Sequence, residues 1–208
     1  IDLQFLGIEN ILALRGDPIK NETHFIPNKA GHKYAVNLIE QVVQMNKGDF
    51  LHEETGNATA TDFCIGAAGY PEKHFESMNL KTDLKYLKEK VDAGAEYIVT
   101  QMFFDNQKYF DFVQTCVDAG INVPIIPGLK PITTLKHISF LPKFFHIDFP
   151  DELSTELEKC KSNDDARQVG IEWGIHQSKE LLEYGVPLLH YYTMGRSASV
   201  KKIASELF

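Results

Sequence analysis

The stretch Asn10-Ile-Leu-Ala-Leu-Arg-Gly-Asp-Pro18 decides how the chain is interpreted, because an apolar run of strand length ends there in a charged turn. Pro18 lacks a backbone N–H, so a strand ladder cannot continue through it. Gly16 allows a close backbone approach, and Asp17 stands where the strand passes into a loop. In a barrel of parallel strands, polar residues at such ends are placed for chemistry. A solvated Asp-Pro turn explains the same residues, so this stretch alone leaves both interpretations open.

Apolar segments of strand length alternate with segments whose apolar residues recur at helical spacing. The expected strands are residues 10–16, 63–69, 97–104, 123–128 and 186–193. The expected helices are residues 34–43, 84–95, 109–119 and 198–207, and a helical region rich in Phe and Leu lies between the last two strands. Residues 46–61 are polar and contain glycines, which is typical of an exposed loop.

This alternation predicts an α/β fold whose active residues lie at the carboxyl ends of parallel strands. The residues at those ends are Arg15 to Asp17, Tyr70, Gln101, Lys130 and Thr193 to Arg196. Two architectures fit. A complete (β/α)8 barrel needs about 250 residues, whereas five strands also fit an open doubly wound sheet. No G-x-G-x-x-G follows an expected strand, which weakens a dinucleotide-binding interpretation of the open sheet.

Length and composition indicate one globular domain, residues 1–208, with ample material for a core. The formal net charge of −8 argues against a nucleic-acid surface. No apolar run reaches membrane-spanning length and no signal peptide is recognisable, so we expect a cytoplasmic protein. The three cysteines form no C-x-x-C pair, which indicates reduced thiols. The histidines take no metal-binding spacing, so no metal site is predicted.

Six short motifs follow one another along the chain. They are LALRGD (residues 12–17), AGYPEKH (68–74), DLKYLKEKVDAGA (83–95), TQMFFD (100–105), IPG (126–128) and YTMGR (192–196). Their order is the one found in methylenetetrahydrofolate reductases. Each motif alone is weakly specific, but six in order with compatible gaps make the chain resemble this family from about Gly7 to its C-terminus.

The resemblance implies a (β/α)8 TIM barrel in which the five strands here are the last five of eight. The first three strand–helix units, including the glutamate that acts as general acid, would then precede Ile1. The chain would by itself expose two sheet edges, which proteins avoid. No residue follows Phe208, and this favours the bacterial type of enzyme over eukaryotic members, which carry a regulatory domain.

The family binds FAD at the carboxyl ends of the strands. By resemblance, Arg15 and Gly16 form the flavin-facing turn, and Asp17 lies beside both the flavin and the pterin. Ordinary packing, turn and capping roles also explain several positions of the set. The cofactor-binding residues that the resemblance assigns are Arg15, Gly16, Asp17, Tyr34, Ala35, Tyr70, His74, Asp83, Tyr86 and Lys90.

Within this set, the N-terminus of the helix at Tyr34 and Ala35 matches positions near the FAD phosphates. Asp83, Tyr86 and Lys90 fall at i, i+3 and i+7 and therefore share one helix face. In the family this face contacts the ribose, the adenine and the phosphates, where Lys90 would supply positive charge.

Gln101 is the principal substrate candidate, because a strand-buried amide needs hydrogen-bond partners at both ends. A core network is the alternative. By resemblance, Gln101 binds the pterin and the nicotinamide carboxamide, and Asp17 and Gln101 are the catalytic residues. The substrate-binding residues that the resemblance assigns are Asp17, Gln101, His137 and Arg196.

By resemblance, His137 lies near the aminobenzoyl end of the substrate, and Leu141 gives apolar cover over the flavin. A surface histidine and a core leucine explain these two residues equally. Phe75 and Gly195 depart from the commoner Pro and Asn of the family, so the paths of their two loops are expected to differ.

The resemblance implies reduction of 5,10-methylenetetrahydrofolate to 5-methyltetrahydrofolate with FAD and NAD(P)H, by a ping-pong hydride transfer that feeds methionine synthesis. The 208-residue piece alone is expected to be inactive, because the general acid would precede Ile1. Two alternatives stay open: another FAD barrel, such as a proline-dehydrogenase-like enzyme, and a non-catalytic fragment. The partners are expected to be small molecules, with no nucleic acid and no membrane, and a homo-oligomer is compatible with the sequence.

Overall fold

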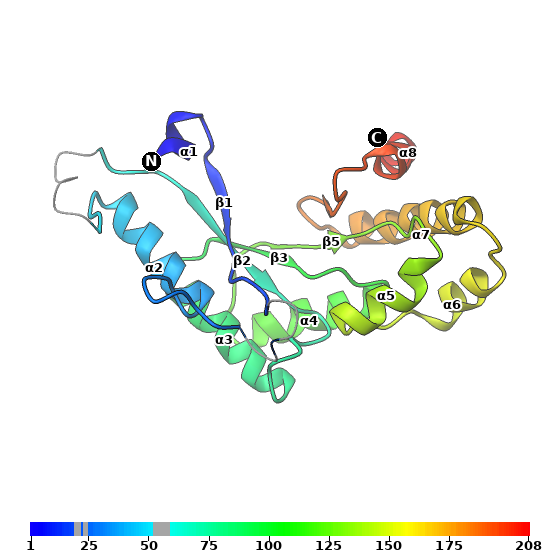
Figure 1. Cartoon of the computed structure of the whole chain (residues 1–208), viewed down its shortest axis with the longest axis horizontal. Coiled ribbons are helices and arrows are strands. Elements are labelled where there is room, and N and C mark those ends of the chain that lie inside the picture. Colours follow the sequence, from blue (N-terminus) through cyan, green and yellow to red (C-terminus); the bar gives the residue numbers. More distant parts are fainter. Residues whose placement is uncertain (19–21, 23–24, 52–58) are drawn as a thin grey trace.

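The structure is a computed structural model that describes residues 1–18, 22, 25–51 and 59–208, so part of the polar stretch 46–61 lies outside the described residues. Its helices are α1 (Asp2–Phe5), α2 (Ala35–Asn46), α3 (Leu80–Asp92), α4 (Asn106–Asp118), α5 (Lys136–Phe145), α6 (Asp151–Glu158), α7 (Asn163–Tyr184) and α8 (Ala198–Leu207) (Figure 1). Its strands are β1 (Asn10–Ala13), β2 (Cys64–Gly69), β3 (Tyr97–Thr100), β4 (Ile125–Ile126), β5 (Gly128–Leu129) and β6 (His190–Tyr191).

The strands lie side by side in the order in which they occur along the chain. β1, β2, β3 and β4 form one parallel sheet, in which Ala13 lies opposite Ala67 and Gly69 opposite Thr100. β5 pairs in parallel with β6. The Thr100 hydroxyl accepts a hydrogen bond from the Gly128 N–H (2.9 Å), which joins β3 to the start of β5.

This sequential order separates the two architectures that the sequence left open. A doubly wound sheet reverses its strand order at a switch point, and no reversal occurs among the described strands. Parallel strands in chain order, with helical connections, are consistent with an arc of a (β/α) barrel. The number of strand–helix units in the complete protein stays a prediction.

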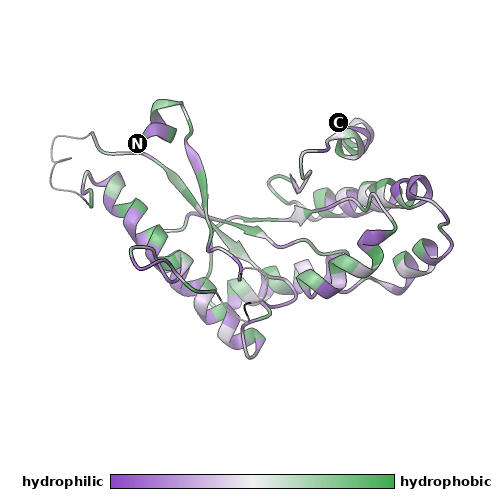
Figure 2. Ribbon diagram, viewed as in Figure 1, coloured by the Kyte–Doolittle hydropathy of each residue, from purple (hydrophilic) through white to green (hydrophobic). Residues whose placement is uncertain are grey.

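Helices α2, α3 and α4 lie along one side of the sheet (Figure 1). Apolar and polar residues alternate around them (Figure 2), as expected of helices that bury one face. Leu87 of α3, Ile98 of β3, Phe112 of α4 and Leu181 of α7 are buried in one cluster. The core therefore lies between the sheet and its helices. Among the described residues, no helix is both long and apolar enough to cross a bilayer.

Helix α7 packs unusually close to the chain that follows β3 and β5. A Cβ at Gly170 would lie 2.1 Å from the Ile132 carbonyl oxygen, so only glycine fits there. The Trp173 indole N–H donates to the Phe104 carbonyl (3.1 Å), and the Gln177 amide donates to the Phe103 carbonyl (3.0 Å). The expected strand 97–104 therefore ends early, at Thr100: the Thr100 carbonyl accepts the Tyr192 hydroxyl (2.8 Å), and the carbonyls of Phe103 and Phe104 are bonded to α7 instead of a neighbouring strand.

Other expected elements also differ from the structure. The expected strand 123–128 is divided into β4 and β5, because Pro127 has no N–H to continue the ladder. The expected strand 186–193 is reduced to β6, and the Phe- and Leu-rich region contains the three helices α5, α6 and α7. The short helix α1 was not predicted.

Candidate functional site

A cavity of about 500 Å³ lies at the carboxyl ends of β1 and β2, between the N-terminus of α2 and one face of α3. This volume is typical of pockets that hold small molecules and cofactors. Nine of the ten residues predicted to bind the cofactor line it, and Gly16 lies between two of them. The nine are Arg15, Asp17, Tyr34, Ala35, Tyr70, His74, Asp83, Tyr86 and Lys90. The structure brings these residues together; their contacts with FAD stay a prediction.

The turn after β1 is held in place by contacts with side chains from other parts of the chain. The Arg15 guanidinium forms an ion pair with Glu76 (2.7 Å) and lies over the Phe25 ring, 5.3 Å from the centroid. A Cβ at Gly16 would lie 3.1 Å from the same ring. The arginine side chain is therefore engaged within the protein, and contacts of the turn's backbone with a flavin stay a prediction.

The loop between β2 and α3 is held in one conformation around Asp83. The Asp83 carboxylate accepts hydrogen bonds from the His74 N–H (3.0 Å) and the Ser77 hydroxyl (2.8 Å). Lys73 has a left-handed backbone (φ 78°), and its ammonium donates to the carbonyls of His74 (3.1 Å) and Ser77 (2.6 Å). Asp83 thus holds the loop that forms one wall of the cavity.

Tyr70 and His74 present two uncharged polar groups to the cavity. Their rings meet edge to face with centroids 4.6 Å apart. Burial, together with the Asp17 and Asp83 carboxylates, raises the pKa of Tyr70 to about 12, so its hydroxyl stays protonated at neutral pH. Burial lowers the pKa of His74. The His74 Nδ1 accepts the Glu76 N–H (3.2 Å), which assigns the proton of the neutral ring to Nε2.

Lys90 carries the most strongly perturbed basic group of the cavity. Its ammonium donates to the Ala68 carbonyl of β2. Burial lowers the pKa of Lys90 to about 8, and the nearby Asp83 carboxylate opposes that shift. A buried ammonium with one backbone partner retains two N–H donors for an anionic ligand.

The acidic side chains of the cavity are mostly engaged with the protein itself. Glu76 is paired with Arg15, Asp83 holds the loop, and Glu89 lies 3.8 Å from Lys85. Within the described part of the chain, no hydrogen bond or ion pair engages the Asp17 carboxylate. The groups available to a ligand are therefore Asp17, Lys90, the Tyr70 hydroxyl and the half-exposed rings of Tyr34 (49%) and Tyr86 (51%).

The remaining predicted substrate residues lie outside this cavity. Gln101 follows β3, is half-buried, and accepts the Met102 N–H at its Oε1 (2.9 Å). His137 lies in the first turn of α5, and Arg196 is exposed in the turn before α8. Leu141 is 1% exposed within the cluster packed around α5, α6 and α7, so the structural alternative holds for it: it is a core residue.

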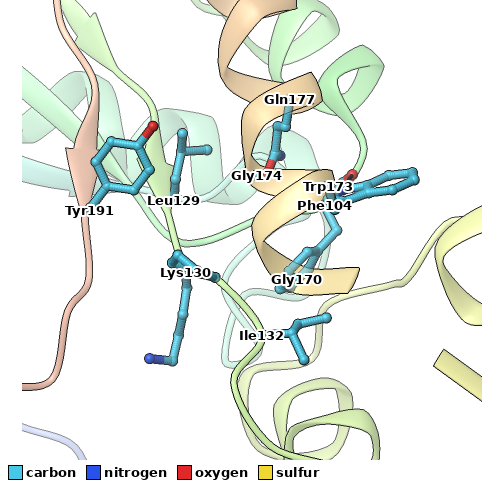
Figure 3. Close-up of a pocket in the computed structure, with 10 residues that line it drawn as sticks. Phe104, Leu129, Lys130, Ile132, Gly170, Trp173, Gly174, Gln177 and Tyr191 are labelled. Atoms are coloured by element: carbon cyan, nitrogen blue, oxygen red, sulfur yellow. Dashed lines mark hydrogen bonds between the residues drawn. The ribbon is translucent and has the colours of Figure 1, made fainter. Parts of the chain in front are cut away.

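A second cavity, between β5 and α7, is too small for an organic ligand. Its volume of about 10 Å³ is that of one water molecule. Figure 3 shows its walls, which include Leu129, Ile132, Trp173 and Tyr191. Within the described ranges, no three His, Cys, Asp or Glu side chains are grouped as a metal site requires.

Glu76, Ser77 and Glu89 line the cavity but were not predicted from the sequence. Glu76 and Ser77 reach it because Lys73 turns the loop through a left-handed conformation, and no sequence pattern signals that turn. Glu89 could have been found, because it lies three residues after Tyr86 on the same helix face.

The sequence profile of the family described as "Methylenetetrahydrofolate reductase" matches residues 2–208. "Methylenetetrahydrofolate reductase (NADH) 1" of Arabidopsis thaliana is 37% identical over 97% of this chain, which corresponds to 33% of the plant protein. "5,10-methylenetetrahydrofolate reductase" of Pectobacterium carotovorum is 33% identical over 92% of this chain and 57% of the bacterial protein. The chain thus spans about a third of the plant relative, and these similar identities do not distinguish a bacterial type.

A solved structure shares the fold. It is titled "Uncharacterized protein from Clostridium thermocellum binds two copies of 5-methyl-5,6,7,8-tetrahydrofolic acid", with a TM-score of 0.53, 16% identity, and coverage of 91% of this chain and 64% of that one. At this identity the likeness concerns the fold alone. The profile match and the relatives above 30% identity show more: the chain belongs to the methylenetetrahydrofolate reductase family.

Proposed function

We propose that this chain forms the flavin-binding part of an enzyme that reduces 5,10-methylenetetrahydrofolate to 5-methyltetrahydrofolate with FAD and NAD(P)H. The main support for the proposal is the cavity at the ends of β1 and β2, which is lined by nine of the ten residues predicted to bind the cofactor. Because the chain spans only part of its relatives, the proposal concerns the complete protein.

The chemistry of the cavity fits FAD. Lys90 and the first turn of α2 offer N–H donors and positive potential to a pyrophosphate. The Tyr34 and Tyr86 rings, each about half exposed, offer faces to a planar heterocycle. Asp17 offers carboxylate oxygens to hydroxyl or ring N–H groups.

FAD, when bound, supplies the hydride chemistry, and the residues of this chain supply binding, orientation and charge. Asp17 is proposed to lie between flavin and pterin, where its free carboxylate stabilises positive charge on the folate. Gln101 is proposed to orient the pterin through its amide. The Tyr70 hydroxyl, kept protonated by its raised pKa, donates a hydrogen bond without adding negative charge.

The nicotinamide nucleotide cannot be assigned from relatives. The Arabidopsis protein is named for NADH and a Caenorhabditis elegans relative for NADPH, and both are 37% identical to this chain. We propose that either nucleotide binds before the folate, at the same face of the flavin. We also propose that the first three strand–helix units and the general acid belong to the complete protein. The 208-residue piece should then bind ligands without turning over.

The test is an anaerobic stopped-flow experiment on the full-length protein. The purified protein should be yellow, lose its flavin absorbance on mixing with NADH or NADPH, and regain it with 5,10-methylenetetrahydrofolate. Proline is the comparison reductant. A colourless protein that takes up no FAD, or a flavin that proline reduces and the nicotinamides do not, would overturn the proposal.

A further inference from the structure

A charged cluster outside the cavity joins three separate segments of the chain. Glu72 lies in the loop between β2 and α3, Lys108 in the first turn of α4, and Asp148 in the connection between α5 and α6. The Lys108 ammonium forms ion pairs with the carboxylates of Glu72 (2.6 Å) and Asp148 (2.5 Å). The Asp148 N–H also donates to the Glu72 Oε2 (3.1 Å), although 76 positions of sequence separate these two residues.

Glu72 is the centre of this cluster because it is the member that the protein largely buries. Its side chain is 9% exposed, whereas that of Asp148 is 79% exposed. An ion pair in contact with solvent contributes little to stability, while a largely buried carboxylate is unfavourable unless donors surround it. Burial raises the pKa of Glu72, and the hydrogen bonds from Lys108 and the Asp148 N–H oppose that rise. Glu72 therefore depends on two donors that come from different segments.

The position of Lys108 is explained by the cluster and not by the helix that carries it. An ammonium in the first turn of a helix lies near the positive end of the helix dipole, which is unfavourable. Both carboxylates that pair with Lys108 come from outside α4. The lysine thus serves a contact between segments that are distant in sequence.

A row of stacked rings joins the same two loops a second time. The His74 ring stacks on the Phe75 ring with centroids 4.8 Å apart, and the Phe75 ring stacks on the His146 ring at 5.4 Å. His146 ends α5 in the left-handed conformation (φ 54°). His74 lines the cavity, whereas His146 is not among the described residues that line it. The rings therefore extend from the wall of the cavity to the start of the connection between α5 and α6.

Glu72 stands between Tyr70 and His74 in the sequence, and both of these residues line the cavity. We propose that Glu72 is a positioning residue that couples the cavity to residues 146–148. It holds the loop in the conformation that presents Tyr70 and His74, and it ties that loop to the connection between α5 and α6. A ligand that binds only the ordered loop stabilises every contact of that loop, so it should order residues 146–148 as well. The inference rests on the proposed function only for the identity of the ligand, FAD.

Hydrogen–deuterium exchange of the full-length protein, with and without FAD, measures this coupling. FAD should slow amide exchange in residues 72–77 and also in residues 146–148, which include an amide that donates to Glu72. In the cofactor-free protein, Glu72→Ala should speed exchange of both segments about tenfold, because charge-assisted hydrogen bonds are lost. FAD should bind this variant about tenfold more weakly, and at saturation it should slow exchange in residues 72–77 but not in residues 146–148.

Two further variants separate Glu72 from the exposed part of the cluster. Glu72→Gln keeps a side-chain oxygen that can accept the Asp148 N–H, so it should retain the coupling and bind FAD within about threefold of the wild type. Asp148→Asn removes the exposed ion pair but keeps the backbone N–H, so it should resemble the wild type.

Several outcomes would overturn the coupling. If FAD binds the wild type and leaves exchange in residues 146–148 unchanged, the coupling fails even when no variant folds, while the proposed function stands. Equal protection of residues 146–148 by FAD in Glu72→Ala and the wild type would show that Glu72 does not join the two loops. An effect of Asp148→Asn as large as that of Glu72→Ala would assign the joint to the exposed ion pair. If the wild type takes up no FAD, the proposed function fails, and wild-type exchange rates in the cofactor-free Glu72→Ala protein would then refute the role of Glu72 separately.

Discussion

Replacing Lys90 by methionine should stabilise the cofactor-free protein and weaken FAD binding. The side chain keeps its length but loses the ammonium, whose pKa falls from 10.5 to about 8 on burial. That difference is equivalent to about 3 kcal/mol of unfavourable free energy for the charged form. Loss of this charge-assisted hydrogen bond to the Ala68 carbonyl costs about 2 kcal/mol. The net gain in unfolding free energy below pH 8 is therefore about 1 kcal/mol.

Because Lys90→Met removes this charge, the free energy of unfolding of the variant should depend on pH differently from that of the wild type. Between pH 8 and 10.5 the unfolded wild-type chain holds the Lys90 proton more tightly than the folded chain. The stability of the cofactor-free wild type should rise with pH in this window, and Lys90→Met should lack that rise. FAD affinity should fall about 10- to 100-fold in the variant at pH 7, because a charge-assisted hydrogen bond to a phosphate is lost.

Urea unfolding of the cofactor-free protein and fluorescence titration with FAD measure the two effects. Lys81→Met is the matched control, because Lys81 is exposed in the first turn of the same helix and does not line the cavity. Arg196→Ala, assigned to the substrate end, should retain FAD. A variant that is less stable and binds FAD normally would refute the reasoning, since Lys90 would then be a structural lysine.

Three further changes test other parts of the site and fold. Gln101→Ala in the full-length enzyme should keep its flavin but lose about 10- to 100-fold in folate turnover; loss of FAD without a kinetic defect would contradict the assignment. Asp17→Asn removes a carboxylate that we propose to lie beside the flavin, so it should raise the flavin reduction potential and slow transfer to folate; an unchanged potential and unchanged rates would make Asp17 a turn residue. Gly66→Ala would place a Cβ 2.3 Å from the Tyr97 ring and should lower the unfolding free energy by about 1–3 kcal/mol; an unchanged urea midpoint would show that the ring can move aside.

Helical spacing alone predicted that three residues of α3 share one face, and the family resemblance assigned that face to the cofactor. Asp83, Tyr86 and Lys90 recur at helical spacing, and all three line the cavity once α3 forms. The end of β3 was not predictable in the same way. The apolar pattern continues through Phe103 and Phe104, but their carbonyls bind Gln177 and Trp173 of a helix some 70 residues later. Such long-range bonds leave no local signal in the sequence.

The ion pair of Arg15 could not be predicted from the sequence either. Arg15 lies in a motif that resembles a flavin-facing turn, yet its guanidinium is bound to Glu76. That contact requires the left-handed backbone of Lys73 and the two hydrogen bonds that Asp83 accepts from the loop. Residue type indicated a cation at the site, whereas the fold pairs Arg15 with Glu76 and, among the described residues that line the cavity, leaves Lys90 with N–H donors that no carboxylate occupies.

The sequential strand order also bears on the size of the substrate. Asp17 follows β1 and Lys130 follows β5, and three inter-strand steps separate these positions through β2 and β3. At about 4.8 Å for each step, the arc between them is about 14 Å long. A substrate that contacts both residues must therefore be elongated. A tetrahydrofolate has that form, with its pterin at one end and its glutamyl tail at the other, whereas proline is too short to reach from Asp17 to Lys130.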